Sequence, residues 1–435
     1  MPLTSGRHGS TYRKWATMRL NLLEQRMLEG EQGQAVALAM RVLTNLGRIS
    51  GAERFVEIES AHVGGLLYNG QSSLDFARHL NSLDATVAVP TTLNSGSVSL
   101  MCPSSYSGDP RTAESAAEVM RCYESMGGQP TWTCAPYLLG TIPQRNADVV
   151  WSESGAVVIA NTLLGARTGR YGSMTDICAA IAGRAPLTGL HVEANRIATV
   201  AFSVEHLSKQ VTEHEAFYQI LGYLVGATAR QDVPAIVGLP PSADDDQLRA
   251  LCVAAATTGS LGMMHLVGIG LGPATLEEAC QGRPVEVKSV TTHQLRAARE
   301  DLHGAGLEDL PIDVVCLGTP HFSASEFTSL HVLLEAEGRP NDGTRLIVTT
   351  NRHTLAELKA GSLYDRLREL GVDILTDVCS YNTKVLPRGV QRAMTNSAKW
   401  AHYGEGNHGI SVVLGSLREC VKSAVLGKVW RDDYL

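Results

Sequence analysis

The sequence predicts an α/β fold, in which βα units with mostly parallel sheets build a multi-lobed core. The chain has 435 residues, of which 44% are hydrophobic, so it can bury one large core or two to three smaller ones. Short apolar runs rich in Val and Ile alternate with amphipathic segments along most of the chain. This alternation is typical of buried parallel strands that are linked by helices.

The short apolar runs are predicted to be strands, and helical patterns fall between most of them. The predicted strands are Arg54–Glu59, Thr86–Pro90, Thr131–Ala135, Ala198–Val204, Pro234–Leu239, Met264–Ile269, Asp313–Leu317, Thr344–Thr349, Asp373–Thr376 and Ile410–Leu414. An early helix is predicted over Gln34–Leu46, where apolar residues recur at helical spacing at Val36, Ala39, Met40 and Leu43. Ligands of such sheets gather at the carboxyl ends of the strands, which is where we expect the functional residues.

The chain is expected to divide into a short flexible segment and one folded region. Residues 1–20 are mostly polar and basic and are predicted to be flexible, and residues 21–435 are predicted to fold. Possible lobes within the folded region are 21–200, 201–310 and 311–435.

Composition excludes several classes of partner. The net charge is −7 with Lys and Arg scattered along the chain, so nucleic acid is not an expected partner. The sequence contains no run of about 18 apolar residues and no signal-peptide pattern, which predicts a cytoplasmic protein without membrane contact. Nine cysteines, an odd number without the spacing of a secreted scaffold, indicate reduced thiols.

Three cysteines stand at or after predicted strand ends: Cys134, Cys316 and Cys379. Thiolates are soft, charged donors that hold iron, so these three are candidate metal ligands. The alternative is that each is a buried small hydrophobic residue. Cys102 lies in a loop, and its role is left open. The remaining cysteines fall in helical patterns and are predicted to be structural: Cys122, Cys178, Cys252, Cys280 and Cys420.

One segment, IANTLLGARTGRYG, presents amide, guanidinium and hydroxyl groups together at a glycine-containing turn. These groups belong to Asn161, Arg167, Thr168 and Arg170. Because Arg binds carboxylates with two parallel hydrogen bonds, the segment is a candidate substrate clamp. An arginine that caps the end of a helix is an equally good interpretation.

Two further segments carry groups suited to acid–base chemistry or anion binding. The segment HVEANR, residues 191–196, places His, Glu, Asn and Arg just before a predicted strand. The segment NSAKWAHYGEG places Asn396, Ser397, Lys399 and His402 ahead of the last strand. Both patterns also occur in ordinary surface loops and helix caps. The glycines of VGIGLG have the wrong interval for a dinucleotide-binding loop, which argues against a nicotinamide dehydrogenase.

Several segments follow one another in a distinctive order and spacing: VPTTLNSGSVSL, CAPYLLG, ESGAVVIANTLLGARTGRYG, GLHVEANRIATV, GYLVGATARQDVPAIVGLP, LGTPHFS and TNSAKWAHYGEG. Together they resemble the large subunit of aconitase X enzymes, a branch of the aconitase superfamily. The resemblance runs from about residue 30 to the end of the chain. It implies an aconitase-like core without the swivel domain, and an iron-dependent dehydratase that carries an iron–sulfur cluster.

The resemblance also implies a ligand set and a substrate. The family's cysteine ligands match Cys134 and Cys379, whereas a third corresponds to Thr319. Either Cys316 or Cys102 replaces that ligand, or the chain resembles the branch with a smaller cluster. The second reading favours cis-3-hydroxy-L-proline as the substrate, with pyrroline-2-carboxylate as the product. The alternatives are the large subunit of a mevalonate 5-phosphate dehydratase and a non-catalytic paralogue that binds small acids without a cluster.

Roles for the other candidate residues follow from the same resemblance. Arg167 and Lys399 are expected to hold the substrate carboxylate. The other predicted substrate-binding residues are Asn161, Thr168, Asn195, Arg196 and Ser397. Proton transfer is assigned to Glu193, His265 or His321. A small partner subunit that carries the swivel domain is expected to cover the site.

Overall fold

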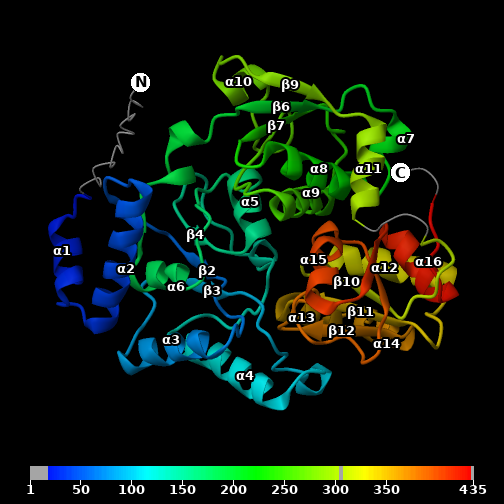
Figure 1. The fold of residues 1–435 in the computed structure, drawn as a ribbon, viewed down its shortest axis with the longest axis horizontal. Helices are drawn as coiled ribbons and strands as arrows, with labels where there is room; N and C mark the ends of the chain where they lie inside the picture. The colour runs from blue at the N-terminus through cyan, green and yellow to red at the C-terminus, as the bar shows by residue number, and fades with distance from the viewer. Residues whose placement is uncertain (1–17, 303–306, 433–435) are drawn as a thin grey trace, which may run out of the picture.

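The structure is a computed structural model that describes residues 18–302 and 307–432, and it confirms the α/β prediction. Four sheets are present in these residues, and all strand pairs except one are parallel. Figure 1 shows the elements gathered into three groups, coloured blue to teal, green, and yellow to red. Residues 1–17 of the segment predicted to be flexible lie outside the described residues. No helix in the described ranges has the length and apolar character needed to cross a membrane.

The first group, residues 18–197, contains two small sheets. Its strands are β1 (Phe55–Glu57), β2 (Ala61–Val63), β3 (Thr91–Leu93), β4 (Val150–Trp151) and β5 (Arg184–Pro186). Strands β3, β2 and β4 form a parallel sheet, and β1 pairs with β5 antiparallel. Its helices are α1 (Leu22–Glu29), α2 (Gln34–Ser50), α3 (Gln71–Ser82), α4 (Pro110–Ser125), α5 (Ser154–Thr162) and α6 (Thr175–Ala182). The predicted early helix is α2, and its residues Ala39, Met40 and Leu43 are fully buried.

The second group, residues 198–302, is built on a four-stranded parallel sheet of order β8-β7-β6-β9. The strands are β6 (Val200–Ser203), β7 (Pro234–Val237), β8 (His265–Leu266) and β9 (Glu286–Ser289). The helices are α7 (Lys209–Thr212), α8 (Phe217–Ala229), α9 (Asp245–Thr258), α10 (Leu276–Cys280) and α11 (Thr292–Asp301). Helices α8 and α9 pack closely because Gly222 and Gly226 have no side chain. A Cβ at either position would come within 2.3 Å of a carbonyl oxygen of α9.

The third group, residues 307–432, is a doubly wound unit with a five-stranded parallel sheet of order β12-β11-β10-β13-β14. The strands are β10 (Val314–Leu317), β11 (Arg345–Thr350), β12 (Val372–Thr376), β13 (Arg392–Thr395) and β14 (Ser411–Leu414). The helices are α12 (Ala324–Glu337), α13 (Arg352–Ala360), α14 (Leu363–Glu369), α15 (Ala398–His408) and α16 (Leu417–Leu426). The carboxyl ends of β10 and β12 are the part of this sheet that carries the site described below.

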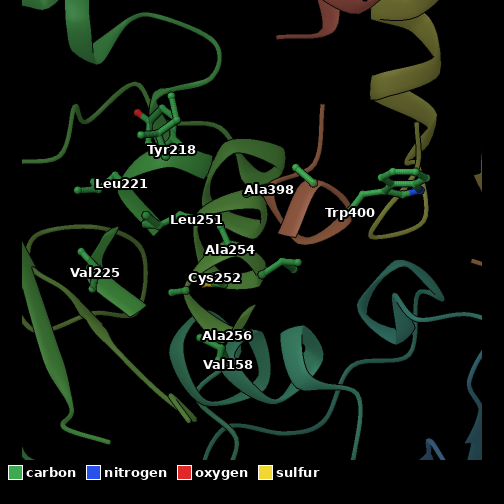
Figure 2. Close-up of a cluster of buried hydrophobic side chains, with 14 of the residues drawn as sticks. Val158, Tyr218, Leu221, Val225, Leu251, Cys252, Ala254, Ala256, Ala398 and Trp400 are labelled. Carbon is green, nitrogen blue, oxygen red and sulfur yellow. The ribbon is translucent and has the colours of Figure 1, made fainter. Parts of the chain in front are cut away.

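One of the hydrophobic clusters contains residues of all three groups. Figure 2 shows Val158 of α5, Leu251 of α9 and Trp400 of α15 in the same cluster of buried side chains. Trp400 is fully buried, and its indole N–H donates to the Ser380 hydroxyl at 3.0 Å. Burying a large apolar side chain stabilises a fold by about 1.5–3 kcal/mol. The groups therefore hold one another in place, and a site between them is positioned by the core.

Two predicted strands are wrong. In Thr86–Pro90 the strand begins only at Thr91, because Pro90 has no N–H to donate and its carbonyl instead accepts from the Ala61 N–H at 2.9 Å. Segment 131–135 is irregular. Its backbone is held by hydrogen bonds between Thr131 or Thr133 and Leu93, and Trp132 has a left-handed φ of 44°.

The cysteines predicted to be structural are buried in helices, as expected. Cys122 lies in α4, Cys178 in α6, Cys252 in α9, Cys280 in α10 and Cys420 in α16. Burial raises the pKa of four of these thiols, those of Cys122, Cys178, Cys252 and Cys420. These thiols stay protonated and inert.

Candidate metal-binding site

Two thiols and an imidazole meet where the first and third groups touch. The ligand atoms of Cys134, Cys379 and His321 all lie within 4.8 Å of one another, and all three side chains are buried. Cys134 belongs to the first group, whereas His321 and Cys379 follow β10 and β12 of the third group. His321 and Cys379 therefore lie at the carboxyl ends of parallel strands, as predicted, whereas Cys134 lies on an irregular segment.

Cys134 is positioned by a short irregular loop that ends in a turn of 3₁₀ helix, Pro136–Leu138. The Thr133 hydroxyl oxygen accepts from the Ala135 N–H at 3.0 Å, which fixes the loop around the thiol. The backbone N–H of His321 donates to Cys134 Sγ at 3.3 Å. This contact ties the first group to the third at the thiol itself.

Cys379 is positioned by Asp377, a fully buried residue with a left-handed φ of 71° at the end of β12. Arg352 binds the Asp377 carboxylate with two hydrogen bonds of 2.7 and 2.9 Å. The same carboxylate accepts from the backbone N–H groups of Leu100 and Met101 at 2.9 and 3.1 Å. Asp377 thus joins a loop of the first group to the strand end that carries Cys379.

The two thiols shift each other's pKa in opposite directions. A hydrogen bond to Cys379 and burial raise the pKa of Cys134 well above the usual value. Burial alone would also raise the pKa of Cys379, but hydrogen bonds from Cys134 and Thr319 outweigh it and lower that pKa. The Thr319 hydroxyl lies 3.2 Å from Cys379 Sγ. Cys379 is therefore the more acidic thiol of the pair, and thiolates are the form that binds iron.

His321 is neutral, and both of its ring nitrogens are already bonded. Nε2 lies 2.8 Å from the Val378 carbonyl oxygen and must donate to it, so Nδ1 accepts from the Thr133 hydroxyl at 3.0 Å. Burial lowers the pKa of His321 to about 4. The imidazole therefore orients the loops of Cys134 and Cys379, and the proton-transfer role predicted for it has no geometric support.

An ion pair between Glu153 and Lys399 lies beside the thiols. Glu153 is the N-cap residue of α5, and Lys399 lies in the first turn of α15. Burial would raise the pKa of Glu153, yet the Lys399 ammonium lowers it below the usual value. Burial would lower the pKa of Lys399, and Glu153 raises it well above the usual value. Asn94 Nδ2 also donates to Glu153 at 3.2 Å, so the pair is buried and charged.

A small cavity of about 80 Å³, here called the front cavity, opens onto Cys134 and Glu153. Its other polar lining residues are Asn94, Ser95, Ser152, Tyr171, Ser173, Tyr381 and Asn382. Lys399 Nζ lies 5.2 Å from the centroid of the Tyr381 ring, which places an aromatic face against the ion pair. A small polar molecule in this cavity would touch a thiol and a carboxylate together.

The segment predicted to be a carboxylate clamp is bonded to the protein itself. Asn161 Nδ2 donates to three carbonyl oxygens, and its Oδ1 accepts from Thr168 N–H and Arg196 Nη1. Arg196 donates further to the carbonyl oxygens of Leu190, Asn161 and Ala166. The Thr168 hydroxyl links Trp151 N–H to a neighbouring carbonyl. These three side chains are buried, and the geometry favours a structural role for them.

The remaining predicted residues lie elsewhere as well. Arg167 Nη2 pairs with Glu193 at 2.5 Å, and that carboxylate is largely exposed. His265 Nε2 bonds to the Arg196 carbonyl oxygen at 2.7 Å, and burial lowers the pKa of this imidazole. Asn195 Nδ2 donates to the Gly189 carbonyl at 2.9 Å. Their predicted roles in binding and proton transfer stay predictions, and the structure does not bring them to the thiols.

Two residues near the site are not part of the thiol group in the described chain. Ser397 caps α15 by accepting from the Trp400 N–H at 3.1 Å, which fixes the helix turn that carries Lys399. Cys316 is fully buried inside β10, where burial raises the pKa of its thiol to about 12. It remains a predicted ligand without a place in the observed group. Cys102 is half-buried in a surface loop and also lies outside it.

Sequence reasoning missed Glu153, Asn94 and Tyr381. The signal for Glu153 was present, because the acidic residue comes two positions after the short apolar run Val149–Trp151 and precedes an apolar helix. That run of three residues was too short to be recognised as a strand end. Asn94 and Tyr381 have no sequence signal, since only tertiary packing brings them to the cavity.

The fold and the site define a class: a three-part α/β protein with a buried thiol pair and an ion pair at converging strand ends. Family models of aconitase X match nearly the whole described chain. The first-domain model covers residues 17–194, the second-domain model 198–300 and the third-domain model 312–426. The chain belongs to the aconitase X family.

Similar proteins agree with this assignment. The chain is 39% identical to the cis-3-hydroxy-L-proline dehydratase of Pseudomonas aeruginosa, covering 94% of this chain and 70% of that protein. It is 37% identical to the protein of the same name from Hypocrea jecorina, covering 94% and 69%. The phosphomevalonate dehydratase large subunit of Thermococcus kodakarensis is 34% identical over 94% of this chain and 100% of its own. The crystal structure of Thermococcus kodakaraensis aconitase X in its holo form superposes with a TM-score of 0.82 at 33% identity, covering 94% and 100%.

Proposed function

We propose that this chain is an iron-dependent dehydratase of cis-3-hydroxy-L-proline. The observation that carries the proposal is the buried thiol pair Cys134–Cys379 beside the buried Glu153–Lys399 ion pair. Two relatives, at 39% and 37% identity, carry the name of this activity. The reaction removes a proton from C2 and the hydroxyl group from C3, which makes the enzyme a hydro-lyase.

The sulfur atoms of the thiol pair are ligands of the kind that an iron–sulfur cluster needs. Cys134 and Cys379 offer two thiolates once they are deprotonated, and the family resemblance matches Thr319, which contacts Cys379, to a third cysteine of the family. The His321 nitrogens are bonded to Thr133 and Val378, so the imidazole keeps its orienting role. A cluster bound there supplies a Lewis acid, the chemistry that weakens the bond between carbon and a leaving hydroxyl.

Lys399 attracts the substrate, and Glu153 removes its proton. The Lys399 ammonium attracts the substrate carboxylate, and that contact takes part of its charge away from Glu153. Burial alone raises the pKa of Glu153, so a weakened ion pair makes this carboxylate a stronger base. Glu153 then takes the proton from C2, the C–H electron pair forms the C2–C3 double bond, and the C3–O electron pair leaves with oxygen as hydroxide. The hydroxide leaves the site with the product and takes up one proton in bulk water, so that one water is formed for each proton that Glu153 passes on.

The large subunit of a phosphomevalonate dehydratase is the second candidate, because five such proteins are similar to this chain over nearly their full length. A phosphate needs several cationic donors. The described residues that line the front cavity include no Arg or Lys, and the neighbouring Lys399 is already paired. This observation favours the smaller substrate with a single carboxylate.

A small subunit with the swivel domain is proposed as the partner. Its support is the name "large subunit" of the relatives that this chain matches from end to end, whereas the hydroxyproline dehydratases extend beyond the match. A cover over the front cavity excludes water and strengthens the interactions of the ion pair with the substrate.

The test is an assay of both substrates with anaerobically reconstituted protein, with and without a co-expressed small subunit. The proposal expects turnover of cis-3-hydroxy-L-proline and none of mevalonate 5-phosphate. Turnover of the phosphorylated substrate alone would transfer the assignment to the second candidate. Full turnover by the chain without a partner would remove the need for the small subunit.

A further inference from the structure

Two more cavities lie on a line of shared residues that begins at Lys399. The first, here called the rear cavity, is small, at about 30 Å³, and is lined by Lys399, Thr319 and His321 at the end near the thiols. The second, the surface cavity, measures about 490 Å³. The two share lining residues: Gln219, Asp246, Ala250, Glu326 and Asn396. The lining is therefore continuous from Lys399 to the surface cavity.

The rear cavity is polar and large enough for about one or two water molecules. The hydroxyl of Tyr137 is buried in its wall and has no hydrogen-bond partner among the described residues. Leaving such a group unsatisfied costs about 1–3 kcal/mol, which a water in the cavity offsets. Water here would also reach the side chains at both ends, Lys399 and Glu326.

Glu326 lies where the rear and surface cavities meet. It is the third residue of α12, and its carboxylate accepts from the Ser323 N–H at 2.9 Å in a capping box. Asp246 and Arg249 of α9 face it from the second group. Burial, with the nearby Asp246 charge, raises the pKa of Glu326 to about 8, although Ser323 and Arg249 partly offset this. This carboxyl is protonated at neutral pH and can both give and take a proton.

We propose that the rear and surface cavities form a proton passage between the Glu153–Lys399 pair and bulk water, with Glu326 as its relay. The proposal rests on the proposed function, in which Glu153 takes a proton from carbon in each turnover while substrate fills the front cavity. Lys399 passes one proton to water in the rear cavity and takes the new one from Glu153. Glu326 releases its proton to the surface cavity and is reprotonated from the rear, so the charges return to their starting values.

Three variants test the passage. Glu326→Gln removes the exchangeable proton but keeps the capping box, which accepts Gln as well as Glu. Ala250→Leu fills the junction of the two cavities with a larger side chain. Glu335→Gln, on an exposed position of the same helix, is the matched control. Thermal melting of each variant checks that the fold is retained.

Glu326→Gln and Ala250→Leu are expected to lower kcat about tenfold with KM unchanged, because resetting Glu153 becomes rate-limiting. The solvent deuterium isotope effect on kcat should rise in both and stay unchanged in Glu335→Gln. Folded variants with unchanged kcat and isotope effect would overturn the passage. An inactive wild type would instead count against the proposed substrate.

A second readout needs no turnover. The infrared spectrum at pH 7 should show the carbonyl band of a protonated buried carboxyl in the wild type and in Ala250→Leu. The band should disappear above pH about 8 and be absent from Glu326→Gln. A Glu326 that is already ionised at pH 7 would overturn its role as a relay, whatever the activity of the enzyme.

Discussion

The thiol site and the segment from Asn161 to Arg170 both place buried polar groups between parts of the fold, but they differ in how their bonding capacity is used. Asn161 of the segment makes hydrogen bonds with both of its side-chain polar atoms. The guanidinium of Arg196, which contacts Asn161, donates to four oxygens. At the thiol site, Cys134 and Cys379 interact mainly with each other, and Glu153 borders a cavity. A distinctive sequence segment can therefore form a structural hydrogen-bond network. Such a network restricts the residue types at its positions as strongly as a binding site does, because each buried donor and acceptor needs a partner.

Replacing Lys399 should have the largest effect on catalysis. Lys399→Met is expected to lower kcat about 10²–10³-fold, since it removes the buried cation that is paired with Glu153 and is proposed to attract the substrate carboxylate. It should also destabilise the fold by about 3–5 kcal/mol, because Glu153 is left as an unpaired buried charge. Steady-state kinetics and urea unfolding measure the two effects.

The double variant Lys399→Met with Glu153→Gln separates stability from catalysis. It removes both charges, so most of the lost stability should return while activity stays low. Recovery of activity along with stability would show that the ion pair only supports the fold.

Replacing Arg196 should show the opposite pattern. Arg196→Met is expected to lower the free energy of unfolding by about 3 kcal/mol, because it leaves several buried oxygens without donors. Iron content per folded chain should not change. Arg283→Met, at an exposed position, is the control and should stay within about 0.5 kcal/mol of the wild type. A large rise in KM without loss of stability would restore the substrate-binding role predicted for Arg196.

Replacing Arg167 should have a smaller effect on stability than replacing Arg196. Its partner Glu193 is 62% exposed, and exposed ion pairs contribute about 0–1 kcal/mol. Arg167→Lys is therefore expected to keep both stability and kcat/KM within a few-fold of the wild type. A sharp loss of activity with an intact circular dichroism spectrum would instead support the carboxylate clamp that the sequence predicts.

The parallel sheets and the two thiols of the site, Cys134 and Cys379, could be predicted from the sequence. Short Val- and Ile-rich runs marked the strands β6, β7, β10 and β11, because strands buried on both faces need continuous apolar residues. Cys134 and Cys379 were found because they follow apolar runs. The segment Thr131–Ala135 was wrongly predicted to be a strand. It has the composition of a strand, but its hydrogen bonds go to Leu93 and do not form a ladder.

Protonation and pairing could not be predicted from the sequence. Nothing local shows that His321 spends both nitrogens on Thr133 and Val378, or that Lys399 faces Glu153 across 246 positions of the chain. These properties arise only when the first and third groups pack together. Cys316 illustrates the same limit, because its place at a strand end is shared with Cys379 while its side chain points into the core.

Iron and sulfide content of anaerobically purified protein tests the central claim most directly. The wild type should carry both, Cys134→Ser and Cys379→Ser should each lose them, and Cys316→Ala should keep them with a stability cost of about 1 kcal/mol. Circular dichroism confirms that each variant is folded. Full iron content in folded Cys134→Ser and Cys379→Ser proteins, or none in the wild type, would contradict the assignment of this thiol pair as the metal site.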